Sequence, residues 1–144
     1  MAEAAQPEIL STSERFTEIA GEWGYESSTV LYRLGKAFYL GRSHVRYRSK
    51  EEVKFGDLYQ STLIPTAQIH PIFPQHFTRA PDHLLAQHYL KEPCLLLFEP
   101  SYPTYLGDSL LGEATIWERL IQSSHPNIVK YHGCQVQDGR ITGL

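Results

Sequence analysis

The sequence predicts an α+β fold in which a mostly antiparallel sheet packs against one main helix. Short β-branched and aromatic runs separated by turn residues favour the sheet, and an Asp138-Gly139 pair lies between two such runs. Apolar residues that recur at helical spacing over residues 109–122 favour the helix. With 144 residues, the chain has room for one domain or for part of a larger one.

The residues before 84 are expected to form a short disordered terminus followed by an extension that contains a helix, short strands and a proline-rich connection. Residues 1–10 lack apolar periodicity and are expected to be a disordered terminus. Ser11 opens a capping box, and apolar residues at helical spacing follow it as far as Trp23. These signals predict an amphipathic helix over residues 12–23, so that the extension over residues 11–83 begins with a helix.

Short strands are expected next in this extension. The runs over residues 29–34 and 37–40 predict a hairpin, with Gly35-Lys36 as its turn, and residues 44–48 are expected to continue the sheet. Four prolines then lie between residues 64 and 81, which predicts a long surface connection before the next folded part.

The second half of the sequence carries stronger signals. After an apolar segment that starts at residue 84, the run Cys94–Phe98 predicts a buried strand. The helix over residues 109–122 follows, with Asp108 as its expected N-cap. Gln122-Ser123-Ser124 and Pro126 are expected to end it.

A hairpin is expected at the carboxyl end of the chain. Residues 128–137 predict a strand, and Asp138-Gly139 is a favoured pair for a two-residue type I′ turn. Arg140 then begins a return strand that is expected to leave an unpaired edge at Leu144.

Composition limits the classes of function. Apolar residues make up 42% of the chain, and 13 basic against 16 acidic residues give a net charge of -3. No overall basic field is present to attract nucleic acid or an anionic membrane. The longest apolar run has five residues, far short of a bilayer span, and the first ten residues carry no basic residue of a secretion signal. Because the two cysteines form no CxxC pair, we expect a reduced compartment and an intracellular, cytoplasmic protein.

Two further features of the sequence are compatible with other functions. An aromatic and basic stretch over residues 32–50 resembles a surface that stacks on single-stranded nucleic acid, but the acidic Glu51 and Glu52 offset its charge. Four histidines lie between residues 70 and 88, but none of them is as close in sequence to another as the two histidines of a metal-ligand pair: His70, His76, His83 and His88. We therefore expect no nucleic-acid partner, no membrane partner and no metal site.

The chain from residue 84 to residue 144 resembles the N-terminal lobe of the protein kinases. Tyr89-Leu90-Lys91 looks like the V-A-I-K strand segment, and residues 113–120 look like the helix that follows it. His125-Pro126-Asn127-Ile128-Val129-Lys130-Tyr131 is similar to the loop and strand after that helix. The Asp138-Gly139 turn completes the resemblance.

The resemblance implies a kinase N-lobe-like sheet and a nucleotide site. It implies that Lys91 contacts the α- and β-phosphates of ATP and that Glu113 is its ion-pair partner, with ATP and Mg²⁺ as cofactors. From the two residues alone, a solvated lysine and a first-turn helix acid are the simpler explanation. In a complete form, the function implied is phosphoryl transfer to protein, by a serine/threonine or tyrosine kinase.

Departures from the family pattern leave an alternative open. Residues 57–90 contain no glycine, although the family's phosphate loop is glycine-rich, and the H-R-D and D-F-G motifs are absent from the chain. If Cys94–Phe98 were the lysine strand, Phe98 or Glu99 would replace the lysine. We therefore expect no catalytic residue and no catalysis by this chain alone. The alternative is a non-catalytic, pseudokinase-like module that binds a protein partner or a missing C-terminal lobe.

Overall fold

The computed structural model describes residues 4–123 and 125–144. Contacts divide the chain into two compact units. The sheet unit comprises the residues up to Thr66 together with Leu95–Pro100, and the helix unit comprises Ala67–Cys94 and Ser101–Leu144. This division does not coincide with the boundary expected after residue 83.

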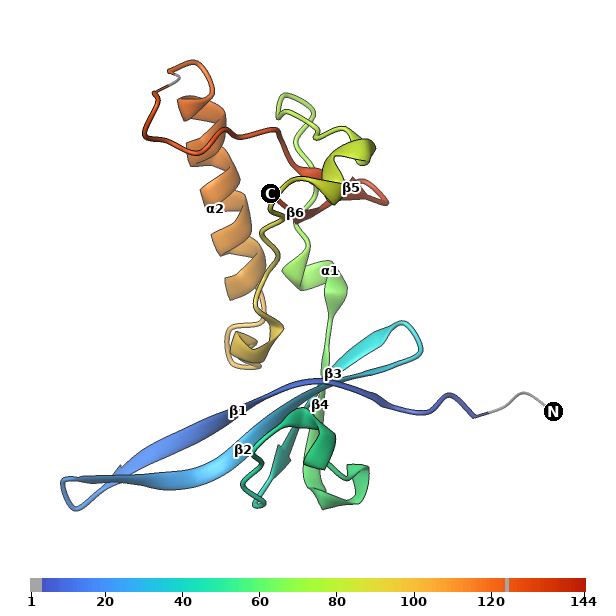
Figure 1. The fold of residues 1–144 in the computed structure, drawn as a ribbon, viewed down its shortest axis with the longest axis vertical. Coiled ribbons are helices and arrows are strands. Elements are labelled where there is room, and N and C mark those ends of the chain that lie inside the picture. The colour runs from blue at the N-terminus through green and yellow to red at the C-terminus, as the bar shows by residue number, and fades with distance from the viewer. Residues whose placement is uncertain (1–3, 124) are drawn as a thin grey trace. The chain divides into compact units, whose positions relative to one another are not determined.

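The sheet unit contains a four-stranded antiparallel sheet in the order β1-β2-β3-β4 (Figure 1). Its strands are β1 (Glu8–Ile19), β2 (Glu22–Leu34), β3 (Ala37–Ser43) and β4 (Leu58–Ile64). The predicted hairpin over Gly35-Lys36 is confirmed, because Leu34 pairs with Ala37 across that turn. Gly35 has a φ of 62°, which a residue without a Cβ adopts readily.

The helix expected over residues 12–23 is wrong, because this stretch forms most of the β1–β2 hairpin. Ala20 and Gly21 both have positive φ, at 53° and 81°, as a type I′ hairpin turn requires. The apolar residues at helical spacing do not face a core, since Ile19 and Trp23 are 72% and 71% exposed. Pairing with the 13-residue β2 outweighs the local helical signal.

The disordered terminus expected over residues 1–10 is also corrected in part. Residues 1–3 lie outside the described residues, while β1 already begins at Glu8. The Glu8 carboxylate accepts a hydrogen bond from Arg33 of β2, and Glu8 pairs with the same residue in the strand register. Pairing with β2 therefore orders residues 8–10, although this stretch has no apolar periodicity.

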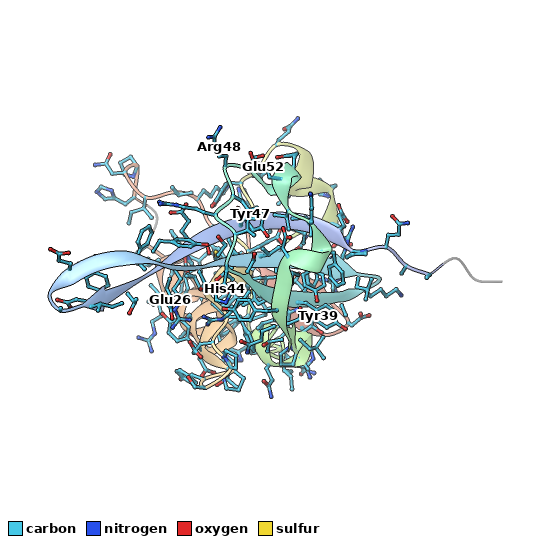
Figure 2. The ribbon with its side chains drawn as sticks, turned by 90° about the horizontal axis from the view of Figure 1, so that it is seen from below. Glu26, Tyr39, His44, Tyr47, Arg48 and Glu52 are labelled. Carbon is cyan, nitrogen blue, oxygen red and sulfur yellow. The ribbon has the colours of Figure 1, made fainter. Side chains whose placement is uncertain are left out.

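The segment between β3 and β4 is a loop with two short 3-10 helices, Lys50–Glu52 and Phe55–Asp57. The expected continuation of the sheet through residues 44–48 is wrong, since β3 ends at Ser43. The Tyr47 hydroxyl donates to Asp57 at 2.9 Å and lies 2.8 Å from the Ser43 hydroxyl. Tyr47 is labelled in Figure 2 together with its loop neighbours Arg48 and Glu52. The hydrogen bonds of Tyr47, together with its burial, hold the loop against the sheet without strand pairing.

The buried strand expected over Cys94–Phe98 is wrong as well. Leu95–Leu97 is a short 3-10 helix that contacts β1 and β2 of the sheet unit. Cys94 is exposed and Leu97 is 64% exposed, whereas Phe98 is buried. Pro93 precedes this turn, and its fixed φ and missing N–H favour a break in regular structure at that point.

The helix unit combines one long helix with a two-stranded sheet. Its elements are α1 (Thr66–Ile69, whose first residue lies at the division between units), a 3-10 helix (Asp82–Ala86), α2 (Tyr105–Leu120), β5 (Gln135–Gln137) and β6 (Arg140–Gly143). α2 packs against β6 (Figure 1). The core of the unit is formed by Leu110, Ala114, Cys134, Val136 and Ile141.

The helix expected over residues 109–122 is confirmed as α2, which begins four residues earlier, at Tyr105, and ends two residues earlier, at Leu120. Asp108 is not its N-cap but lies in the first turn, because the helix begins at Tyr105 after Thr104. The hydroxyls of Tyr102 and Thr104 both donate to the Asp108 carboxylate at 3.0 Å. The hydrogen bond to Asp108 and the charge of that carboxylate raise the pKa of Tyr102 above its usual range.

The carboxyl-terminal hairpin has the expected turn but a shorter first strand. Asp138 and Gly139 have φ values of 51° and 72°, the signature of the predicted type I′ turn. The strand expected over residues 128–137 is limited to Gln135–Gln137. The unpaired edge expected at Leu144 is wrong, since Leu144 and Lys91 exchange two backbone hydrogen bonds.

None of the helices in the described part of the chain has both the length and the apolar character that a membrane span requires.

Candidate functional site

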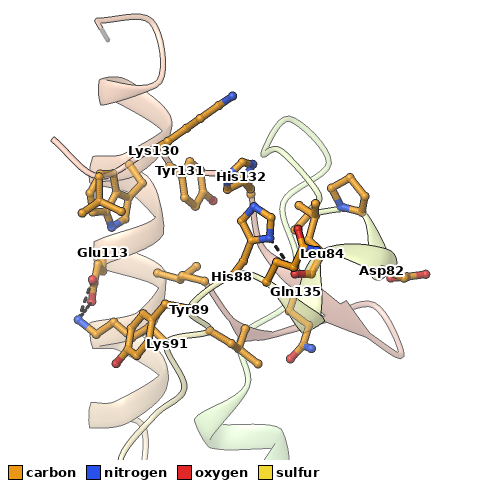
Figure 3. Close-up of a pocket in the computed structure, with 18 residues that line it drawn as sticks. Asp82, Leu84, His88, Tyr89, Lys91, Glu113, Lys130, Tyr131, His132 and Gln135 are labelled. Atoms are coloured by element: carbon orange, nitrogen blue, oxygen red, sulfur yellow. Dashed lines mark hydrogen bonds and ion pairs between the residues drawn. The ribbon is translucent and has the colours of Figure 1, made fainter. Parts of the chain in front are cut away.

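The helix unit contains a pocket of about 500 Å³ (Figure 3). Three parts of the chain line it: the segment from Ala80 to Lys91, the α2 residues Glu113 and Trp117, and the segment from Val129 to Gln135. Leu144 completes the wall. The volume lies within the range of about 300–1,000 Å³ that small-molecule pockets occupy.

Lys91 and Glu113 meet at the wall of this pocket. The Lys91 ammonium nitrogen lies 2.7 Å from each of the two Glu113 carboxylate oxygens (Figure 3). The side chains are 51% and 32% exposed, so water still reaches the pair. The structure thus brings together the two residues that the sequence singled out, which are 22 positions apart in the chain.

Backbone pairing fixes the position of Lys91. Its N–H donates to the Leu144 carbonyl and its own carbonyl accepts from the Leu144 N–H, both at 2.9 Å. Gly143 lies close to this pairing, because a Cβ there would approach the Lys91 carbonyl oxygen to 3.0 Å and Leu90 Cδ1 to 2.8 Å. Lys91 itself lies outside the strands of the unit, unlike the V-A-I-K strand that it resembles.

An aromatic wall lies beside the ion pair. The rings of Trp117 and Tyr131 are stacked, with centroids 5.8 Å apart and an interplanar angle of 18°. Trp117 is four residues after Glu113, so the two side chains share one face of α2. The wall thus offers the pocket a flat aromatic surface next to a cation.

A hydrogen-bonded group behind this wall holds Tyr131 in place. The Tyr131 hydroxyl donates to Glu118 at 3.3 Å and lies 3.2 Å from the Cys134 sulfur. Glu118 also accepts the Thr78 backbone N–H at 2.6 Å and the Thr78 hydroxyl at 3.1 Å. Burial, followed by the contacts with Cys134 and Glu118, raises the pKa of Tyr131 far above its usual range. The hydroxyl therefore remains a neutral hydrogen-bond donor.

Two histidines form another part of the wall. The rings of His88 and His132 are in edge contact with centroids 4.5 Å apart, and His88 Nδ1 lies 2.8 Å from the Leu84 carbonyl oxygen (Figure 3). Desolvation, His88 and Lys130 lower the pKa of His132, which favours its neutral form. Within the described ranges, no three metal-ligating side chains come together.

Other residues of interest in the sequence lie elsewhere. Phe98 and Glu99 belong to the sheet unit, so neither takes the place of Lys91 in the pocket. The basic and aromatic stretch over residues 32–50 also belongs to the sheet unit, where Arg46 pairs with Glu14 at 2.9 and 3.0 Å. Sequence reasoning did not assign Trp117, Tyr131 or His88 to the site. The i, i+4 spacing of Glu113 and Trp117 is the signal that could have indicated Trp117.

The arrangement can bind an anionic ligand that has an aromatic part. The Lys91 ammonium supplies a compact positive charge, and Glu113 orients it. Comparison with protein-family models, curated proteins and solved structures finds no match for this chain. The kinase resemblance therefore rests on the sequence motifs of residues 84–144 alone.

Proposed function

We propose that residues 84–144 form a kinase N-lobe-like part that binds ATP with Mg²⁺, in which Lys91 contacts the phosphates. The single observation that supports this best is the ion pair at the pocket wall, with Lys91 Nζ 2.7 Å from both Glu113 oxygens. In the kinase family, this pairing holds the phosphate lysine in place. The proposal does not extend to phosphoryl transfer by this chain, because its sequence lacks the H-R-D and D-F-G motifs that supply the base and the metal-binding residues in kinases.

The chemistry of the pocket suits such a ligand. Lys91 can keep one contact with Glu113 and still offer N–H donors to phosphate, because an ammonium group has three donors. The stacked pair of Trp117 and Tyr131 offers an aromatic face on which a purine can stack. The Lys91 side chain is half exposed, so a phosphate can reach it from solvent.

Tryptophan fluorescence tests this proposal in the whole chain. The protein has two tryptophans, Trp23 and Trp117, so Trp23→Phe leaves a single reporter within the pocket. We expect ATP with Mg²⁺ to change the Trp117 emission and to raise the melting temperature. Lys91→Met should abolish both effects, and Glu113→Gln should weaken them.

The control is Lys54→Met, which removes an exposed lysine of the sheet unit and should leave both responses unchanged. An unchanged emission and melting curve at saturating nucleotide would contradict the proposal. So would an equal response from the Lys91→Met protein.

A second candidate function is a protein-interaction module without catalysis. A set of apolar side chains on α2 and the segment after it supports it, since these residues are 36% to 80% exposed: Ile116, Leu120, Ile121, Ile128 and Val129. Exposed apolar patches of this kind mark protein-binding surfaces. Under this alternative, nucleotide has no effect, and an Ile116→Ser, Ile128→Ser double variant, which changes two exposed residues outside the pocket wall, loses a partner that the unaltered protein binds. The same double variant should respond to ATP normally if the first proposal holds.

A further inference from the structure

The two edges of the four-stranded sheet differ in charge. β1 carries four charged residues: Glu8, Glu14, Arg15 and Glu18. The Glu8 carboxylate accepts a hydrogen bond from Arg33 of the neighbouring strand β2. β4, at the other edge, has the sequence LYQSTLI without a charged residue or a proline. Charged residues on an edge strand prevent pairing with another chain, and β4 lacks this protection.

The outer side of β4 is open within the described residues. β4 pairs with β3, and no further backbone hydrogen bond joins it to another segment in the part of the chain that the structure describes. Tyr59 and Leu63 are each 51% exposed, and Gln60 and Ser61 are exposed as well. Backbone N–H and C=O groups at such an edge can pair with one more strand.

The order of side chains along β4 is self-complementary. In an antiparallel pair centred on Ser61, Tyr59 of one copy lies opposite Leu63 of the other, Gln60 lies opposite Thr62, and Leu58 lies opposite Ile64. Such an arrangement is the isologous contact of a two-fold dimer. The flanking Asp57 falls opposite Pro65, so the pairing brings no like charges together.

The pairing also extends a row of apolar side chains that the sheet already contains. Tyr32, Tyr39 and Leu63 are cross-strand neighbours on β2, β3 and β4, and the rings of Tyr32 and Tyr39 are stacked 5.2 Å apart. Tyr32 is 3% exposed, whereas Leu63 at the end of the row is 51% exposed. Tyr59 of a second copy would be the next member of this row and would cover Leu63.

We propose that the chain forms a two-fold dimer in which the β4 strands of two copies pair antiparallel about Ser61 and join two four-stranded sheets. The occupant of the edge is a second copy of this chain because the pairing about Ser61 sets apolar side chains opposite apolar ones and polar opposite polar, and brings no like charges together. β4 lies in the sheet unit and outside the pocket, so the proposal does not depend on nucleotide binding.

A charge-exchange experiment tests both the dimer and its register. Sedimentation of the unaltered chain should show a mass that rises with concentration from 16.5 kDa to twice that value. Ser61→Lys places two lysines opposite each other on the axis and should weaken the dimer by about fivefold or more. Ser61→Glu should do the same, and a mixture of the two variants should restore association, because lysine then faces glutamate.

The matched control is Ser13→Lys, which introduces the same charge on the other edge strand and should leave the dimer unchanged. Circular dichroism of each variant checks that the sheet is retained. A mass of one chain at every concentration would overturn the proposal. This result would also be obtained if β4 paired only with a different protein. A dimer that is insensitive to Ser61→Lys, or a mixture no stronger than either variant alone, would overturn it as well.

Discussion

Lys91 and Leu144 exchange two backbone hydrogen bonds of 2.9 Å, although 53 positions separate them in the chain. This pairing holds the Lys91 main chain beside β6 while its side chain reaches Glu113 on α2. Gly143 allows the close approach, since any Cβ there would meet Leu90 and Lys91. Lys91 is thus fixed at both ends: its main chain is bonded to Leu144, and its ammonium group is bonded to the Glu113 carboxylate.

Removing the Lys91 charge should have little effect on stability. The pair is partly open to water, with side chains 51% and 32% exposed, and such ion pairs contribute up to about 1 kcal/mol. We expect Lys91→Met and Glu113→Gln each to lower the free energy of unfolding by less than about 1 kcal/mol, as measured by urea denaturation. A much larger loss would mean that the pair holds the fold together, and a loss of nucleotide binding in these variants would then be uninformative.

Gly133 should be far less tolerant of substitution. It has a φ of 120°, and a Cβ would lie 2.7 to 2.9 Å from backbone atoms of Ala80, Thr78 and Arg79. We expect Gly133→Ala to lower the free energy of unfolding by at least about 1–3 kcal/mol, measured by urea denaturation. Gly112→Ala on α2 is the matched control. Apart from its chain neighbours and the backbone of α2 itself, no described atom lies within 4 Å of the added Cβ. The change should be neutral or stabilise by about 0.5–1 kcal/mol. Equal effects of the two changes would contradict the packing described for Gly133.

The two cysteines should react at very different rates. Cys94 is exposed, whereas Cys134 is fully buried in the core of the helix unit. Burial raises the pKa of Cys134, which reduces its thiolate fraction further. We expect one equivalent of a thiol reagent to react rapidly with the native protein and two with the protein in denaturant. In Cys94→Ser, the rapid reaction should vanish. If it persisted, Cys134 would be open to solvent.

Stability should fall as the pH drops from 7 to 5. Burial and the nearby Arg140 lower the pKa of His70, with Glu92 opposing them in part. Below a pH of about 6.5, the unfolded chain takes up a proton that the folded chain resists, so the free energy of unfolding falls with pH. The fall stops once the pH lies below the lowered pKa of the folded state.

Thermal melts test this prediction. Between pH 7 and pH 5, His70→Asn should lose less stability than the unaltered protein. An identical pH dependence of variant and unaltered protein would exclude His70 as a cause. His132, whose pKa is also lowered, contributes in the same direction.

Local chemistry was sufficient for the turns and for the long helix. Gly35-Lys36 and Asp138-Gly139 were identifiable because two-residue hairpin turns need positive φ, which glycine and aspartate tolerate. The spacing of Leu110 and Ala114 identified the buried face of α2, because residues four apart lie on one side of a helix. Each of these signals acts over a few neighbouring residues, so it can be read along the chain.

Local chemistry was misleading where distant pairing decided the structure. Residues 12–23 carry a helical pattern, yet hydrogen bonding to β2 makes them a hairpin whose apolar residues Ile19 and Trp23 remain exposed. Cys94–Phe98 is as apolar as a buried strand but pairs with no strand in the part of the chain that the structure describes, and its residues Leu95–Leu97 form a short 3-10 helix. The α+β class was thus predictable from local patterns, whereas the number and partners of the strands were not.

The residue types of the candidate site can be recognised along the chain, but their proximity is a property of the packed unit. The sequence alone identifies Lys91 and Glu113 as a potential pair by resemblance. Only the tertiary structure places them 2.7 Å apart, and only the tertiary structure stacks Tyr131 on Trp117 to form the aromatic wall. The physical reason is that turns and helices depend on dihedral preferences of adjacent residues, whereas a pocket depends on which distant segments bury their apolar surface together.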